Sequence, residues 1–288
     1  MSLTFAVLLI AQVGPNPALG APPSVPEELL EQRRRNAERQ QEADETQRSR
    51  LAECLSLVAE SERRGTEFAR NWRETAGADD AAQATHCLGF SHIRAGRFGE
   101  AQASFATALG EAREDNPAYR ARLGGMAGNA ALVSGDGASA ERYFAGAVED
   151  AQRAADAGLT AGLSVDHARA LVALRRPDEA ATALNTARTL DPSNTRAWLL
   201  SATLARRLDQ LVEAQEHIAY AAELSPDDPA IALEAGVIAA LSGSMQDARR
   251  NFETVLSLAP DGNEAPRARS YLEQLAPPVA SSGEEGAQ

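Results

Sequence analysis

The stretch IALEAGVIAALSGSMQDARRNFETVLSLAPD, residues 231–261, decides the fold of this chain. Relative to Ala248, it places Gly236 twelve residues earlier, Phe252 four residues later and Pro260 twelve residues later. A small residue in one helix and an alanine in the next let two short antiparallel helices approach closely, and the large residue one turn later fills the space beside them. Proline ends the unit because it cannot continue a helix. The stretch therefore predicts a helical hairpin.

The same spacing occurs five times in register along the chain. The central alanines, which we use as anchors, are Ala101, Ala140, Ala180, Ala214 and Ala248. The small residues twelve positions before them are Gly89, Gly128, Ala168, Ala202 and Gly236. The large residues four positions after them are Phe105, Phe144, Leu184, Ile218 and Phe252. A hairpin of this kind cannot bury its apolar surface alone, so successive hairpins are expected to stack into a solenoid.

The anchor spacing is 39, 40, 34 and 34 residues, and this pattern resembles the tetratricopeptide repeat family over residues 82–262. The resemblance implies an all-α fold, a right-handed superhelical solenoid of antiparallel helix pairs with five repeats. The two wide spacings do not decide the helix lengths or the loops near 110–125 and 150–162. Residues 51–80 are expected to form an irregular helix pair before the first repeat, and residues 263–276 a capping helix.

The two ends of the chain have different compositions. Residues 1–20 have an apolar run too short to span a bilayer, followed by prolines and small residues, which is typical of a secretory signal cleaved near Gly20 and Ala21. We expect a linker at 21–26, a polar charged helix at 27–50 and a disordered tail at 277–288. The mature protein is therefore expected to be periplasmic or secreted, without a stable membrane span.

The overall composition excludes several function classes. A net charge of −13 argues against nucleic acid as a partner, which needs a basic surface. All 28 basic residues are arginine, so a phosphate-binding loop that needs lysine is absent from the sequence. The sequence has no recognisable nucleophile–base set. We therefore predict no catalytic residues, no cofactor, no metal and no enzymatic activity.

The two cysteines, Cys54 and Cys87, lie 33 residues apart on predicted first helices of neighbouring pairs. In an exported protein such a pair can form a disulfide, but two buried thiols are the alternative, and both remain open. A metal site that also uses His86 and His92 would need regular ligand spacing, which the sequence lacks. Structural roles are therefore expected, with His86 on the exposed face of its helix.

The family resemblance implies that the residues 18, 15, 11, 8 and 7 positions before each anchor line the concave groove. These 25 positions contain no Asp or Glu, although the protein is acidic. The candidate partner-binding residues are His86, Phe90, Arg94, Arg122, Asn129, Arg169, Arg196, Thr203, Arg206 and Arg207. Guanidinium groups there would bind a partner segment that carries carboxylates. The alternative is that these arginines pair with acidic residues of adjoining repeats.

The pattern as a whole predicts a non-enzymatic scaffold of the cell envelope that binds a protein or peptide segment in the groove. A structural or assembly subunit of an envelope complex, related to cell division or the outer membrane, is the alternative. In that case the helix at 27–50 would make the contact. Whether the protein forms an oligomer is left open.

Overall fold

The computed structural model describes residues 31, 34–35 and 50–275 of the chain. The chain divides into two units, Met1–Arg50 and Leu51–Gln288. The predicted signal, linker and tail, and most of the predicted helix at 27–50, lie outside the described residues. Everything below concerns the second unit, whose described residues contain helices and turns but no strand.

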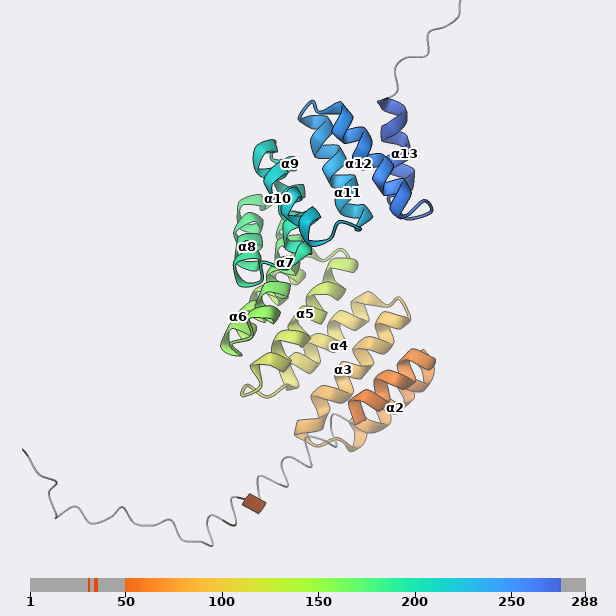
Figure 1. The fold of residues 1–288 in the computed structure, drawn as a ribbon. Coiled ribbons are helices and arrows are strands. Elements are labelled where there is room, and N and C mark those ends of the chain that lie inside the picture. Colours follow the sequence, from red (N-terminus) through yellow and green to blue (C-terminus); the bar gives the residue numbers. More distant parts are fainter. Residues whose placement is uncertain (1–30, 32–33, 36–49, 276–288) are drawn as a thin grey trace, which may run out of the picture. The chain divides into compact units, whose positions relative to one another are not determined.

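The described part of the second unit is a series of short helices (Figure 1). Residues 50–60 are helical and precede the first labelled helix. The labelled helices are α2 (Glu62–Thr75), α3 (Ala78–Arg94), α4 (Phe98–Glu111), α5 (Pro117–Val133), α6 (Gly137–Arg153), α7 (Ala157–Ala173), α8 (Pro177–Leu190), α9 (Thr195–Arg207), α10 (Leu211–Leu224), α11 (Pro229–Leu241), α12 (Met245–Leu258) and α13 (Ala265–Gln274). Each helix packs on its neighbour in sequence. The first repeat begins at Ala78, slightly before the expected 82.

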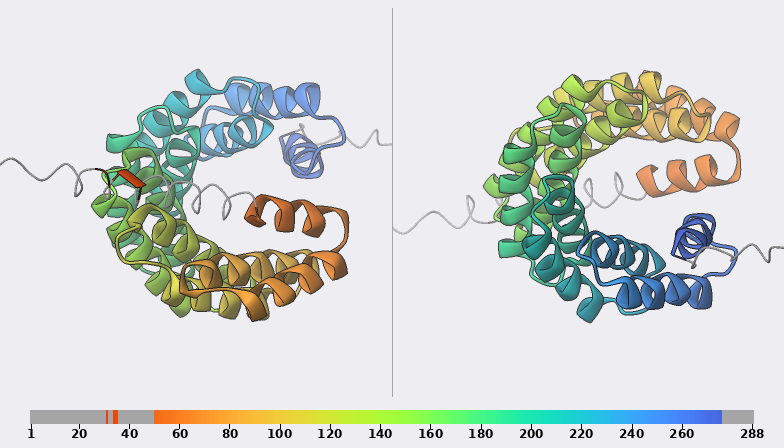
Figure 2. Two further views of the ribbon diagram at one scale, coloured as in Figure 1. Left: turned by 90° about the horizontal axis from the view of Figure 1, so that it is seen from below. Right: turned by 90° about the horizontal axis from the view of Figure 1, so that it is seen from above.

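The helix pairs follow one another in a curved row (Figure 2). Helix α5 contacts α7, α7 contacts α9 and α9 contacts α11, in addition to the contacts between sequence neighbours. Helices on the inside of a curved stack lie closer together than those on the outside. The odd-numbered helices α3 to α11 therefore form the inner, concave wall, and the even-numbered helices form the outer wall.

The two wide anchor spacings come from longer helices. Helices α5 and α7 have 17 residues each, whereas α9 and α11 have 13. On the outer wall α6 has 17 residues, whereas α8 has 14. The additional residues extend the helices by about one turn instead of forming long loops.

The small and large residues of each repeat fit together as a matched pair. A Cβ atom added to Gly236 would lie 2.4 Å from the Phe252 ring, and one added to Gly89 would lie 2.4 Å from the Phe105 ring. At Gly128 the added atom would lie 2.8 Å from the ring of Phe144. The two repeats with a smaller aliphatic residue carry alanine in place of this glycine, in the buried pairs Ala168–Leu184 and Ala202–Ile218. The size of one residue thus sets the size of its partner.

The turn within each repeat uses a left-handed backbone conformation five residues before the anchor. Glycine occupies this position in three repeats, as Gly96, Gly135 and Gly243, with φ between 72° and 85°. The other two repeats use Arg175 and Asp209, with φ of 59° and 61°. Glycine adopts this conformation without steric cost, whereas other residues are strained there. The repeat geometry therefore fixes the backbone even where the sequence does not favour it.

A disulfide joins Cys54, in the helix at 50–60, to Cys87 in α3, with 6.3 Å between the two Cα atoms. Both cysteines are fully buried, and they pack with Val58, Ala69 and Trp72. The bond ties the N-terminal helix pair to the first repeat.

Candidate functional site on the concave wall

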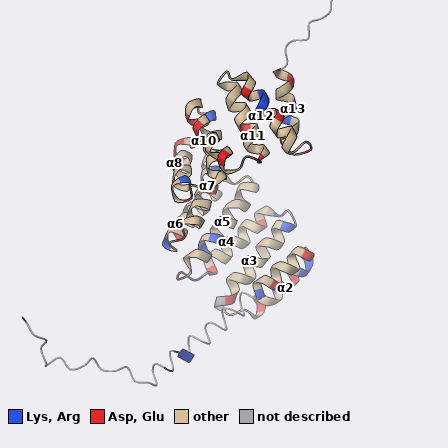
Figure 3. Cartoon of the chain, viewed as in Figure 1, with Lys and Arg blue, Asp and Glu red and all other residues tan. Residues whose placement is uncertain are grey.

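The candidate binding surface lies on the concave wall, where the predicted groove residues of α5, α7 and α9 meet. Acidic and basic residues lie close together along the array and do not separate into long stretches of one sign (Figure 3). Val133 and Leu241 are large apolar residues seven positions before their anchors, and they are 60% and 56% exposed. The wall thus combines paired charges with exposed aliphatic groups.

Asp166 in α7 links three of the predicted groove residues. Its Oδ1 atom lies 3.1 Å from the Nη1 atom of Arg169 and 3.1 Å from the Nη2 atom of Arg196. Asn129 of α5 donates a hydrogen bond to the carboxylate at 3.5 Å and accepts one from Arg169 at 3.3 Å. The Asp166 side chain is only 16% exposed. Its charge is therefore shared by two guanidinium groups, and the network connects α5, α7 and α9.

Two further groove arginines also have acidic partners. The Nε and Nη2 atoms of Arg206 donate to the two carboxylate oxygens of Glu234 in α11, at 2.6 and 3.3 Å. Arg122 lies 3.9 Å from the Asp156 carboxylate, at the start of α7. Pairing of groove arginines with acidic residues of adjoining repeats, the alternative left open by the sequence, is what the structure contains at Arg122, Arg196 and Arg206, whereas Arg169 pairs within its own helix. The groove is much less positive than its arginine count suggests.

The carboxylates Asp166 and Glu234 were missed as wall residues because the family pattern does not assign position 14 before the anchor to the groove. Both residues occupy that same register position. Asp166 also stands three residues before Arg169, a spacing at which side chains on a helix meet. That spacing could have predicted the Asp166–Arg169 pair from the sequence. No local signal exists for Glu234, which pairs across repeats.

A small apolar pocket opens on the wall between α7 and α9, with a volume of about 150 Å³. The predicted groove residues Arg169, Thr203 and Arg207 lie at it. The remaining lining residues are Ala168, Val172, Leu184, Leu200 and Leu204. The structure thus brings three of the predicted residues together around an aliphatic pocket.

Arg94 and Arg207 differ from the other groove arginines. Both are exposed, and neither has a hydrogen bond or ion pair within the described residues. Both stand seven residues before their anchor, near the end of an inner helix. They are therefore the groove guanidinium groups that remain available to an outside carboxylate in this part of the chain.

The exposed position predicted for His86 is wrong. His86 is only 6% exposed, and its ring packs between Phe90, Phe105 and Tyr119. The Nδ1 atom lies 3.2 Å from the Tyr119 hydroxyl oxygen. Burial disfavours the charged imidazolium and lowers the pKa of His86 to about 4. His86 therefore belongs to the core between the first two repeats, and Phe90 packs against the same core.

A second cluster of charged and aromatic residues joins α8, α9 and α10. Trp198 stacks on Tyr220 with 4.5 Å between ring centroids, and the Arg188 guanidinium carbon lies 5.0 Å from the centroid of Trp198. Arg188 also bonds His217, whose pKa is lowered by burial and by this neighbouring positive charge. These contacts join consecutive repeats, and their polar groups are mostly paired with one another. The cluster is therefore explained by repeat packing.

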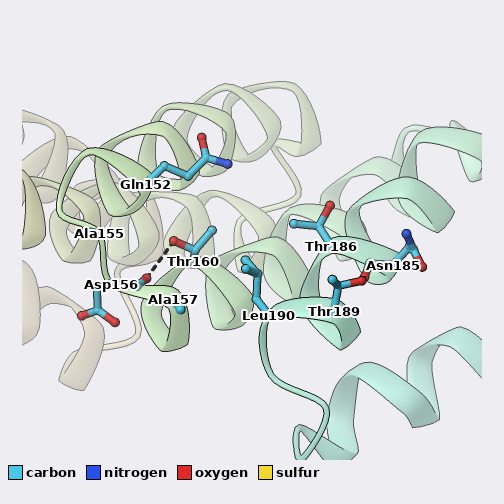
Figure 4. A pocket seen from close by; sticks show the side chains of 9 residues that line it. All are labelled: Gln152, Ala155, Asp156, Ala157, Thr160, Asn185, Thr186, Thr189 and Leu190. Carbon is cyan, nitrogen blue, oxygen red and sulfur yellow. Dashed lines mark hydrogen bonds between the residues drawn. The ribbon is translucent and has the colours of Figure 1, made fainter. Parts of the chain in front are cut away.

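A second pocket, about 510 Å³, lies where the ends of α6 and α8 meet the start of α7 (Figure 4). The Thr160 hydroxyl donates to the backbone carbonyl of Asp156, and the Thr189 hydroxyl donates to that of Asn185. Asp156 itself caps α7 by accepting from the Leu159 amide. The Asp156 carboxylate also lies 3.9 Å from Arg122 of α5. These hydroxyl and carboxylate groups are thus engaged within the protein, and they do not converge on a common point as binding groups would.

The described residues contain no group of three or more His, Cys, Asp or Glu side chains that could hold a metal ion. No helix among them is both long enough and apolar enough to cross a membrane.

Comparison with known proteins agrees with this geometry. Residues 165–229 and 202–263 match a sequence model of the tetratricopeptide repeat. No curated protein matches the chain. The prediction of an all-α helical repeat solenoid is confirmed by the solved structures that resemble it.

Three solved structures illustrate this likeness. The Pseudomonas aeruginosa protein pilF aligns over 79% of this chain and 98% of its own, with a TM-score of 0.62 and 14% identity. YrrB, described as a TPR protein with an unusual peptide-binding site, aligns over 71% and 99%, with a TM-score of 0.51 and 22% identity. A thermophilic TPR protein of Thermus thermophilus aligns over 68% and 98%, with a TM-score of 0.52 and 20% identity. At these identities the likeness concerns the fold alone.

Proposed function

This chain is a tetratricopeptide-repeat protein, and from this premise we propose that it is a non-enzymatic scaffold that binds a partner protein segment along its concave wall. The observation that carries the proposal is the composition of that wall between α5 and α11. Exposed Val133 and Leu241 flank the charge network of Asp166 and the aliphatic pocket at Arg207. Apolar contacts of this kind supply affinity, and the charged groups supply specificity. The peptide-binding site named for YrrB supports the same use of the fold.

We further propose that the protein acts in the cell envelope after export. The buried Cys54–Cys87 disulfide supports an oxidising compartment, because such bonds are rare in reducing cytosol. The protein isolated from native cells is expected to begin at Ala21 and to contain no free thiol. Intact-mass measurement without reductant tests both points. A cytosolic protein that retains residues 1–20 and two free thiols would contradict export.

Site-directed photo-crosslinking tests the binding function. Peptides that bind the full chain are first selected from a random displayed library. A photo-reactive amino acid is then placed at Val133 or Leu241 on the inner wall. The matched controls are Val212 and Met245, which are exposed apolar residues at the starts of the outer helices α10 and α12.

Selected peptides are expected to crosslink from the two inner positions and not from the two outer ones. This result follows if the inner wall excludes water from a bound segment. Crosslinking from Val212 and Met245 alone would place the binding surface on the outer wall and contradict the proposal. Failure of every selected peptide to crosslink at the inner positions would contradict it as well.

A further inference from the structure

The aliphatic pocket between α7 and α9 is large enough for one side chain of a bound segment. Its volume of about 150 Å³ equals that of an engineered apolar protein cavity that accepts a benzene ring. Val172 of α7, Leu184 of α8 and Leu200 of α9 line it. These side chains offer no charge to a ligand. The pocket itself therefore selects an aliphatic or aromatic group.

The charges around the pocket are unequal. Arg169 is engaged with Asp166 and Asn129, and the neighbouring Arg206 is engaged with both oxygens of Glu234. Arg207 also lies at the pocket, but it is exposed and has no hydrogen bond or ion pair in the described part of the chain. The local positive charge is thus concentrated on a single accessible guanidinium at the pocket.

We propose that this pocket recognises a partner segment in which an apolar residue stands next to a carboxylate. The apolar side chain fills the space between Val172 and Leu200, and the carboxylate pairs with Arg207. A guanidinium offers a carboxylate two parallel N–H donors, so the pair fixes orientation as well as affinity. The proposal rests on the concave-wall function and specifies which chemistry that wall selects.

Charge complementarity favours a polypeptide carboxylate over other anions. The chain carries a net charge of −13, so a polyanion such as nucleic acid would be repelled over most of the surface. A short segment with one carboxylate next to an apolar side chain meets the local positive charge and the pocket together. A segment with only one of the two features would lose either the contacts in the pocket or the pair with Arg207.

Arg70 provides a control within the same chain. It is exposed, and it has no hydrogen bond or ion pair among the described residues. It lies on α2, is not one of the predicted groove residues and does not line the pocket. Replacing it by glutamine removes the same charge from the chain without touching the proposed site.

The experiment uses peptides selected by display against the full chain, with their dissociation constants measured by fluorescence anisotropy. The selected peptides are expected to share an apolar residue adjacent to Asp or Glu. R207Q is expected to weaken binding about tenfold or more, because a hydrogen-bonded pair with a charged group contributes about 1.5–3 kcal/mol. R70Q is expected to change the dissociation constant less than twofold. Replacing the acidic residue of the peptide by its amide should weaken binding to the parent chain to the same extent, and should have little further effect on R207Q.

The outcomes separate this inference from the general function. If peptides crosslink to the inner wall but share no apolar–acidic pair, or if R207Q and R70Q behave alike, the pocket assignment is overturned while the concave-wall function stands. If no peptide crosslinks to the inner wall, the function itself fails. If R207Q instead changes the mass in sedimentation, the occupant is a second copy of this chain, and the assignment to a separate partner is overturned. Replacing the peptide's apolar residue by serine should also cost about tenfold, and no loss would count against the pocket.

Discussion

The matched pair of small and large residues in each repeat leads to a quantitative prediction for Gly236. In G236A the new Cβ atom would lie 2.4, 2.6 and 3.0 Å from three carbons of the Phe252 ring. Carbon atoms normally approach to about 3.5–4.0 Å, so the ring or the helix must shift by about 1 Å. Phe252 is 1% exposed, so its ring is enclosed by protein on all sides. We expect overpacking to cost about 1–3 kcal/mol.

The control for this change is Gly146, which stands in the middle of α6 with nothing within 4 Å of an added Cβ. Both substitutions gain helix propensity, about 1 kcal/mol for alanine over glycine. G146A should therefore stabilise the protein, and G236A should be less stable than G146A by the overpacking cost. Adding F252L to G236A recreates the combination found at Ala168 and Leu184. The double-mutant cycle should give a favourable coupling of about 1–3 kcal/mol.

Urea unfolding of the four variants, followed by far-ultraviolet circular dichroism, measures these differences. Equal stability of G236A and G146A would show that the ring does not confine the glycine. An additive effect of F252L would show that the two residues do not determine each other's size. Either result would refute the packing argument on which the repeat assignment depends.

Four further predictions follow from individual contacts. Replacing both Cys54 and Cys87 by serine should lower the free energy of unfolding by about 3–4 kcal/mol, as expected for a loop of this length, and added reductant should destabilise the parent protein but not the variant in urea unfolding. E234A should destabilise the protein by about 3 kcal/mol, because Arg206, whose side chain is only 19% exposed, loses its ion-pair partner. The double change R206M/E234L should recover most of that loss in thermal unfolding. His86 has a folded-state pKa of about 4, below its unfolded value, so the unfolded state binds more protons between about pH 4 and 6.5. Stability contributed by the neutral ring should therefore be lost as pH falls through that range, by up to about 3 kcal/mol, and H86F should flatten this part of the pH profile of the urea midpoint. R207Q should weaken binding of the selected peptides about tenfold in fluorescence anisotropy, while R70Q should not.

The repeat pattern predicted the helix pairs because close helix approach depends on a few residue sizes at fixed spacing. Gly236, Ala248 and Phe252 stand where those size constraints act, so the sequence carries them directly. The turns were predictable at Gly96, Gly135 and Gly243, because glycine is the residue that the left-handed conformation favours. The same turns at Arg175 and Asp209 have no such local signal, and only the register identifies them.

The pairing of the groove arginines with carboxylates could not be predicted in the same way. Arg206 pairs with Glu234 across 28 residues, and Arg122 with Asp156 across adjoining repeats. Such pairs depend on how far one repeat is rotated against the next, which no single repeat encodes. The burial of His86 has a similar cause, since Phe105 and Tyr119 come from two other helices. The sequence predicted the position of each side chain along its helix, but it did not predict which residues of other repeats that side chain contacts.

Hydrogen–deuterium exchange of the full chain, with and without a saturating selected peptide, tests the central claim most directly. We predict that the peptide slows exchange in the inner helices α7 and α9, over residues 165–173 and 199–207, and leaves the outer helices α8 and α10 unchanged. Slowed exchange confined to α8 and α10, or to residues before α3, would show that the partner binds elsewhere and would contradict a concave binding wall.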